Sequence, residues 1–171
     1  MKTIIAYTDG SAVVSGANKG RGGFGVYFPD FYGKKKGISI GYGNTKTGRM
    51  EQMALLYAIK SIKKIDEVEL SIYSDSQYVL KAFTEKRLQK WANSSGNVKN
   101  RDLWEGILSE LNKRSNLILD IRWIKSHQLE KEKDPIAKAK LIQNSHIIGN
   151  AMADRLANRW RSGDLKKTDK L

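Results

Sequence analysis

An apolar, β-branched run near the N-terminus, Thr3-Ile4-Ile5-Ala6, is the feature that most constrains the fold. Such a run predicts a buried strand. Tyr7-Thr8-Asp9-Gly10-Ser11 follows directly, so we expect Asp9 to lie at or near the end of this strand. Gly10 has no Cβ, which allows backbone to come close to a ligand. An Asp-Gly pair after a strand is more commonly a turn, and these residues alone leave that alternative open.

The periodicity of the remaining sequence predicts an α/β layer fold with a mixed sheet. Alternating apolar residues over 24–28 and 38–42 indicate two further strands, which form an antiparallel meander with the first. A helix over about 50–65, capped by Thr47 or Gly48, precedes a strand over 68–72. The elements expected after it are helices from 77 and over about 100–113, a strand over 117–123, a helix over 137–142 and a final helix from about Gly149.

Composition favours a nucleic-acid partner. The chain has 31 Lys and Arg against 18 Asp and Glu, a formal net charge of +13. A positive field of this size attracts polyanions, although a solubilising surface remains the alternative. The chain lacks cysteine, which excludes disulfides and thiolate metal sites and fits a reducing compartment. We see neither a signal peptide nor a membrane span, and we expect a cytoplasmic monomer that does not bind membranes.

Four acidic residues occupy positions that a shared site would require. Asp9 and Asp75 each follow a predicted strand, and both emerge at one edge of the sheet if these strands are parallel neighbours. Glu51 begins the helix before the second of these strands, and Asp154 lies in the first turns of the last helix. Three of the acids also have a common alternative role: Asp9 as a turn residue, Glu51 as a helix-dipole carboxylate and Asp75 as an N-cap.

Carboxylates that share a cleft repel one another unless cations neutralise them. Hard divalent ions such as Mg²⁺ prefer oxygen ligands, and a pair of them is the usual apparatus for displacement at phosphate. A basic protein with an acidic cleft is therefore a candidate nuclease. Spacing alone still leaves open that the four residues are unrelated surface acids.

The sequence resembles type 1 ribonuclease H from the first strand to about Ala157, in the order of that family's motifs. The segments that carry the resemblance are Tyr7-Thr8-Asp9-Gly10-Ser11, Arg49-Met50-Glu51, Ser74-Asp75-Ser76-Gln77-Tyr78-Val79, Val98-Lys99-Asn100-Arg101-Asp102-Leu103-Trp104, Trp123-Ile124-Lys125-Ser126-His127 and Gly149-Asn150-Ala151-Met152-Ala153-Asp154-Arg155-Leu156-Ala157. The resemblance implies a five-stranded mixed sheet, with three antiparallel strands and then two parallel ones, flanked by helices. It implies a single catalytic domain over residues 1–162 and a polar, flexible tail over 163–171.

The resemblance also implies an activity, which is hydrolysis of the RNA strand of RNA–DNA hybrids to give 5′-phosphate and 3′-hydroxyl ends. Two Mg²⁺ ions, or Mn²⁺, would be held by Asp9, Glu51, Asp75 and Asp154. His127 would assist proton transfer or product release. We expect His146, which precedes the final helix, to matter little.

Substrate contacts follow from the same resemblance. Backbone at Gly10 and Ser11, with Glu51, would sense ribose 2′-hydroxyls, which distinguish RNA from DNA. Gln77 would contact base edges in the minor groove, and Asn100 would help to hold a DNA phosphate. The basic segment expected to contact the duplex comprises Lys86, Arg87, Lys90, Trp91 and Lys99.

Three departures from the family pattern affect these expectations. Thr47 and Gly48 stand where Asn or Gln is frequent, the basic protrusion is short, and the connection from His127 to Asn150 is long and charged. Two other functions are therefore considered, a nucleic-acid-binding protein that has lost catalysis and a different metal nuclease on the same fold. Four intact acids argue against the first, and the full set of short motifs argues against the second.

Overall fold

The computed structural model describes residues 1–85, 87–92 and 96–162. Lys86 and the tail over 163–171 therefore lie outside the described residues. The strands are β1 (Lys2–Ala12), β2 (Gly22–Phe31), β3 (Lys34–Tyr42), β4 (Val68–Ser74) and β5 (Leu117–Trp123). The helices are α1 (Thr47–Ser61), α2 (Gln77–Thr84), α3 (Arg87–Ala92), α4 (Arg101–Asn112), α5 (Gln128–Lys131), α6 (Pro135–Ile142) and α7 (Ser145–Asn158).

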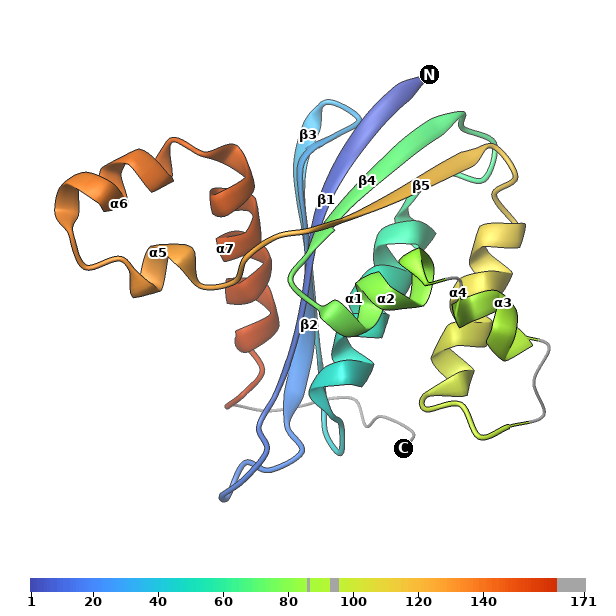
Figure 1. Ribbon diagram of the computed structural model, residues 1–171, viewed down its shortest axis with the longest axis horizontal. Coiled ribbons are helices and arrows are strands. Elements are labelled where there is room, and N and C mark those ends of the chain that lie inside the picture. The colour runs from blue at the N-terminus through green and yellow to red at the C-terminus, as the bar shows by residue number, and fades with distance from the viewer. Residues whose placement is uncertain (86, 93–95, 163–171) are drawn as a thin grey trace.

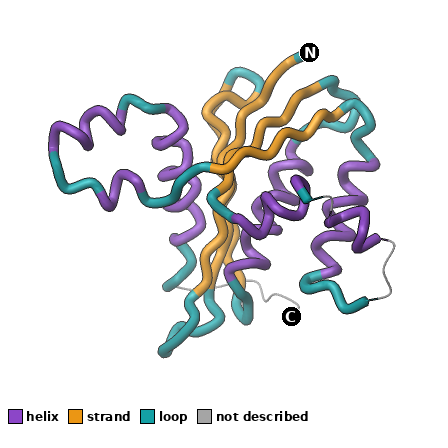
Figure 2. Tube along the Cα trace, viewed as in Figure 1, coloured by secondary structure: helices purple, strands orange, loops and turns teal. Residues whose placement is uncertain are grey.

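The described strands form one five-stranded sheet in the order β3-β2-β1-β4-β5, which Figure 2 shows as a single twisted layer between helices. Pairing is antiparallel between β1 and β2 and between β2 and β3. It is parallel between β1 and β4 and between β4 and β5. The predicted mixed sheet, three antiparallel strands followed by two parallel ones, is confirmed.

Helices cover both faces of the sheet (Figure 1). On one face, α1 packs under the strands together with α2, α3 and α4, and the main core lies there. Its fully buried side chains include Ile4 and Phe24 from the strands and Leu55 and Ile59 from α1. On the other face lies α7, and the α5–α6 segment projects beyond it as an arm (Figure 1). None of the helices in the described ranges is long and apolar enough to cross a bilayer.

Helix α1 differs at both ends from the sequence prediction. Its N-cap is Lys46, without a side-chain cap bond, so the predicted caps Thr47 and Gly48 are instead the first helical residues. At the other end, Ile62 is extended and buried and closes the core. The predicted apolar stripe continues to Ile65, which is 83% exposed, because the chain has already left the helix.

Helix α7 begins at Ser145, four residues before the predicted start at Gly149. Asn144 caps it by accepting hydrogen bonds from the backbone N–H groups of His146 and Ile147. The predicted helix over 137–142 is present as α6, which the Asp134 side chain caps and Pro135 begins. The charged connection is therefore a helical arm, and His146 lies inside the final helix rather than before it.

Candidate active site

Asp9 and Asp75 meet because β1 and β4 are parallel neighbours. Their ladder ends at the pair Thr8 and Ser74, so the next residue of each strand is one of the two acids. Side chains alternate along a strand, which places Asp9 on the same face as Tyr7 and Ser11. That face is covered by α7, since the Ser11 hydroxyl donates to Asn158 Oδ1 at 2.7 Å.

Close packing of α7 on β1 positions Asp154. Gly149 lies against the Tyr7 ring, and a Cβ at this position would lie 2.2 Å from a ring carbon. Only glycine allows the helix this approach. Five residues further along α7, Asp154 lies close enough to Asp9 to raise its pKa, and the Asp154 Oδ1 accepts from Asn158 Nδ2 at 2.7 Å.

Glu51 reaches the same cluster from the first turns of α1. The Ser76 hydroxyl donates to Glu51 Oε2 at 2.6 Å and also caps α2 by accepting from the backbone N–H of Val79. Ser76 rather than Asp75 is therefore the N-cap of α2. The Asp75 carboxylate remains directed at the other acids, and the common N-cap role considered for it does not apply.

Burial and mutual repulsion raise the pKa of three of these acids. The pKa of Asp9 lies well above its usual value, first because the carboxyl is buried and then because Asp75 and Asp154 are close. Burial also raises the pKa of Glu51, which Ser76 and Lys99 partly offset. The pKa of Asp75 is raised by burial and by Asp154, and is lowered by His127. Electrostatic contacts thus link Asp9, Asp75 and Asp154 to one another and link Glu51 to Asp75.

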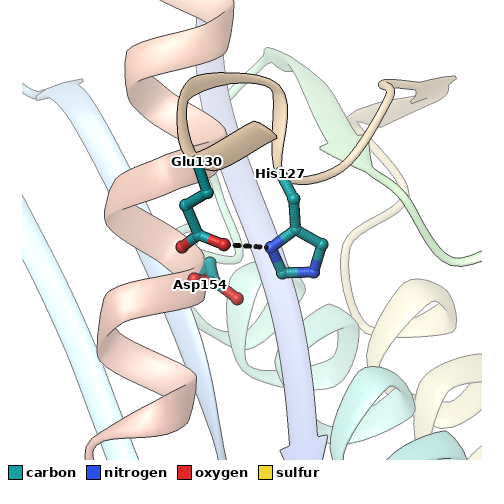
Figure 3. A group of neighbouring side chains, drawn as sticks. All are labelled: His127, Glu130 and Asp154. Carbon is teal, nitrogen blue, oxygen red and sulfur yellow. Dashed lines mark hydrogen bonds and ion pairs between the residues drawn. The ribbon is translucent and has the colours of Figure 1, made fainter. Parts of the chain in front are cut away.

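His127 lies beside this cluster, at the end of the loop that follows β5. That loop is held to the sheet where the Ile124 N–H donates to the Ser74 carbonyl at 3.1 Å. His127 has a left-handed backbone, with φ of 53°, and its Nδ1 lies 3.0 Å from Glu130 Oε2. Figure 3 shows both side chains next to Asp154, and the donor atoms of the three residues lie within 4.8 Å of one another.

Oxygen donors dominate the site and fit a divalent cation. Asn150 lines a small pocket together with His127, Glu130 and Asp154. Its side chain is 6% exposed, and among the described residues its Oδ1 is a buried oxygen without a hydrogen-bond partner. Such an oxygen is costly unless a ligand or water satisfies it. Carboxylate oxygens beside it, from Glu130 and Asp154, are the type of ligand that Mg²⁺ or Mn²⁺ prefers.

His146 has a structural environment of its own. Its Nδ1 lies 2.9 Å from the Tyr7 hydroxyl, and its ring lies 4.2 Å from the Tyr73 ring. Burial, with the nearby Tyr73 and Tyr27, raises the pKa of Tyr7 to about 12, so the hydroxyl stays protonated. These contacts fasten the first turn of α7 to β1 and β4.

The predicted substrate-binding residues are spread around the cluster. Gln77 is exposed at the start of α2. Asn100 precedes α4, where its side-chain amide lies 2.7 Å from that of Gln52. Lys99 is close enough to Glu51 to lower its pKa. On α3, Lys90 is exposed and Arg87 forms an ion pair with Glu85 at 2.5 Å. The Trp91 ring packs 5.3 Å from that of Trp104, so part of it serves the core.

Sequence reasoning missed three contacts that shape the site. Arg49, which is buried, makes a bidentate ion pair with Asp102 at 2.8 and 2.9 Å, and this pair joins the first turns of α1 and α4. The other two are the Ser76–Glu51 bond and the Glu130–His127 bond. Arg49, Asp102 and Ser76 all stand in the recognised motifs, which was the available signal. Glu130 stands in the arm and carried none.

Comparison with known proteins assigns the family. The RNase H family model matches residues 1–162. The ribonuclease H of Hahella chejuensis is 41% identical over 133 residues, covering 74% of this chain and 83% of that protein. The solution structure of the PFV RNase H domain superposes with a TM-score of 0.64 at 26% identity, over 91% of this chain and 92% of the domain. The foamy viral protease-reverse transcriptase in complex with RNA/DNA hybrid gives 0.68 at 22% identity, and this chain matches 20% of that longer protein. The chain therefore belongs to the ribonuclease H family, as a type 1 member.

Proposed function

We propose that this chain is an endonuclease that hydrolyses the RNA strand of RNA–DNA hybrids and requires a divalent metal ion. The observation that carries the proposal is the group of Asp9, Glu51, Asp75 and Asp154 near the end of the parallel ladder between β1 and β4, where the pKa values of Asp9, Glu51 and Asp75 are raised. Family membership supports the reaction class, and a foamy viral protein with this fold has been solved with an RNA/DNA hybrid. We assign the catalytic unit to residues 1–162, acting as a monomer.

The four acids would hold two Mg²⁺ ions, with Mn²⁺ as an alternative. Bound there, the ions supply an activated water and charge stabilisation for the leaving 3′ oxygen, which gives 5′-phosphate and 3′-hydroxyl products. Among this chain's own groups, His127 lies close enough to Asp75 to lower its pKa, and it would transfer a proton during the reaction. Gly10 and Ser11 place backbone next to the cluster, where the 2′-hydroxyl that marks RNA would be sensed.

Hybrid cleavage is the direct test. With a labelled RNA–DNA hybrid, duplex DNA and duplex RNA, we expect cutting of the hybrid's RNA strand alone, and only with added Mg²⁺ or Mn²⁺. The Asp75→Asn variant, which removes a proposed metal ligand, serves as the inactive control. Cleavage that persists in chelator would contradict the metal requirement, and binding of hybrid without any cleavage would favour a non-catalytic binder.

The basic segment predicts a salt-dependent affinity. Each phosphate contact contributes about 0.9 to the slope of log affinity against log salt on a duplex. Affinity falls as salt rises, and the double variant Lys90→Gln, Lys99→Gln should make this negative slope shallower by about 1.8, with little change in turnover at saturating substrate. Lys64 and Lys113 are exposed beyond the far ends of α1 and α4, so their double Gln variant is the charge-matched control. Equal slopes for the two variants would mean that the segment does not contact substrate.

A further inference from the structure

Glu130, which contacts His127, lies in a segment to which neither the motifs nor the proposed metal ligands assign a role. Glu130 lies in α5, one helical turn after His127, and its Oε2 is 3.0 Å from His127 Nδ1. Building on the proposed function, we propose that Glu130 is a positioning residue for His127. It fixes the rotamer and the tautomer of the imidazole, so that Nε2 is the nitrogen available to the reaction.

The backbone leaves the His127 side chain free for this contact. His127 is the N-cap residue of α5, yet its side chain makes no cap bond, and its left-handed φ of 53° turns the side chain away from a capping position. The turn is held from its backbone, where Lys131 N–H donates to the His127 carbonyl at 3.1 Å, and from Gln128, whose Nε2 donates to the Lys125 carbonyl at 2.9 Å. The imidazole ring is therefore positioned by its own side-chain contact, which is the one with Glu130.

The ring's second nitrogen lies on the side away from Glu130 (Figure 3). A carboxylate is acceptor-only when ionised, so Nδ1 must donate to Glu130 and carry a proton. In the neutral ring Nε2 then has the free lone pair. A base whose far nitrogen is oriented by a carboxylate is the arrangement that acid–base sites on unrelated folds also use.

The contact between His127 and Glu130 adds little to stability, so replacing Glu130 can distinguish a structural role from a positioning role. The side chains of His127 and Glu130 are 41% and 67% exposed, and an exposed pair three residues apart contributes little to stability. A purely structural Glu130 would therefore show almost no effect on replacement. A positioning Glu130 would lower the cleavage rate while leaving both the fold and hybrid binding intact.

The first experiment reads the tautomer directly. In metal-free protein at pH 8, long-range ¹H–¹⁵N spectra of the imidazoles should show His127 protonated on Nδ1, with the His127→Ala spectrum assigning the signals. In Glu130→Ala this fixed preference should be lost. Glu132 is the matched control, because its carboxylate accepts from the Asp134 backbone N–H at 2.9 Å and does not contact His127. An unchanged His127 spectrum in Glu130→Ala would overturn the proposal.

The second experiment measures coupling. Removing the hydrogen-bond partner of a metal-ligating histidine costs about 10–100-fold in metal affinity or activity, and we take the lower end of that range for a histidine that transfers a proton. We expect Glu130→Ala to slow single-turnover hybrid cleavage by about 10-fold at unchanged affinity, with Glu130→Gln intermediate and Glu132→Ala unchanged. In the His127→Ala background, Glu130→Ala should have no further effect. An equal loss in that background would mean that Glu130 acts independently of His127. Cleavage that persists in Asp75→Asn would instead count against the proposed function. The tautomer measurement does not depend on that function, because it reads the imidazole in metal-free protein.

Discussion

Asp9→Asn should abolish cleavage of the hybrid and yet leave the metal-free protein as stable as the parent, or more stable. Cleavage is lost because the substitution removes a proposed metal ligand. This ligand lies close enough to Asp75 and Asp154 for their charges to raise its pKa. Stability is kept because the buried Asp9 carboxylate is repelled by the two acids, and the amide carries no charge.

The sign of the pH dependence follows from the raised pKa. Folded protein binds more protons at Asp9 than unfolded protein does, so its stability falls as pH rises from about 4, the ordinary aspartate pKa, through the raised value. Asp9→Asn removes this share of the fall, and its advantage should be largest above the raised pKa. Thermal midpoints in chelator across this range would measure it.

Asp102→Asn provides a contrast with the opposite sign. Hydrogen bonds and charge from Arg49 lower the Asp102 pKa, so this carboxylate adds stability that is present above pH 4 and is lost as pH falls through the lowered value. The substitution should therefore destabilise the protein at neutral pH. If Asp9→Asn also lowered the midpoint in chelator, Asp9 would have a stabilising partner and the repulsive cluster would be wrong.

Gly10→Ala should cost about 3 kcal/mol of stability and should also abolish cleavage. A Cβ at Gly10 would lie 2.1 Å from the Glu51 backbone nitrogen and 2.4 Å from the Met50 carbonyl carbon. Backbone cannot move aside as a flexible side chain can, so α1 must separate from β1. The sequence suggested that Gly10 admits a ligand; the structure shows that it also admits the helix that carries Glu51.

Gly106→Ala is the matched control, because it also adds one methyl group. Gly106 lies in α4, and its added Cβ would meet Leu56 Cδ2 at 3.7 Å, an ordinary van der Waals distance. Alanine also favours a helix by up to about 1 kcal/mol over glycine. Urea unfolding should therefore show a loss for the first variant and no loss for the second. A Gly10→Ala protein within about 1 kcal/mol of the parent would mean that α1 does not press on β1 as described.

Local patterns in the sequence predicted those parts of the site that depend on strand order. The proximity of Asp9 and Asp75 follows from two apolar runs that pair in parallel as far as Thr8 and Ser74. Asp9 does not end its strand as predicted, because β1 continues to Ala12 through its pairing with β2. The start of α7 was predicted too late because Gly149 looked like a helix boundary. Residue 149 is a glycine because it packs against the Tyr7 ring, 142 positions earlier in the chain, and no local pattern reveals that contact.

The contacts between Ser76 and Glu51 and between Arg49 and Asp102 were hidden for a related reason. Each joins side chains whose neighbourhood depends on how helices dock, and helix docking is set by packing rather than by periodicity. Glu130 was missed because a charged segment between two motifs resembles a solvated loop until its helices are seen.

His146 attaches the start of α7 to the sheet, and Ile124 attaches the chain that follows β5. The length of the segment between these two attachment points can therefore vary. Both ends of that interval are tied to strands of the sheet, one through Tyr7 and Tyr73 and the other through Ser74. Insertions or deletions within residues 128–143 thus leave the spacing between Asp154 and the other acids unchanged. A change in this interval would therefore alter the arm and its contact with His127 while the attachment of the sheet to α7 stays in place.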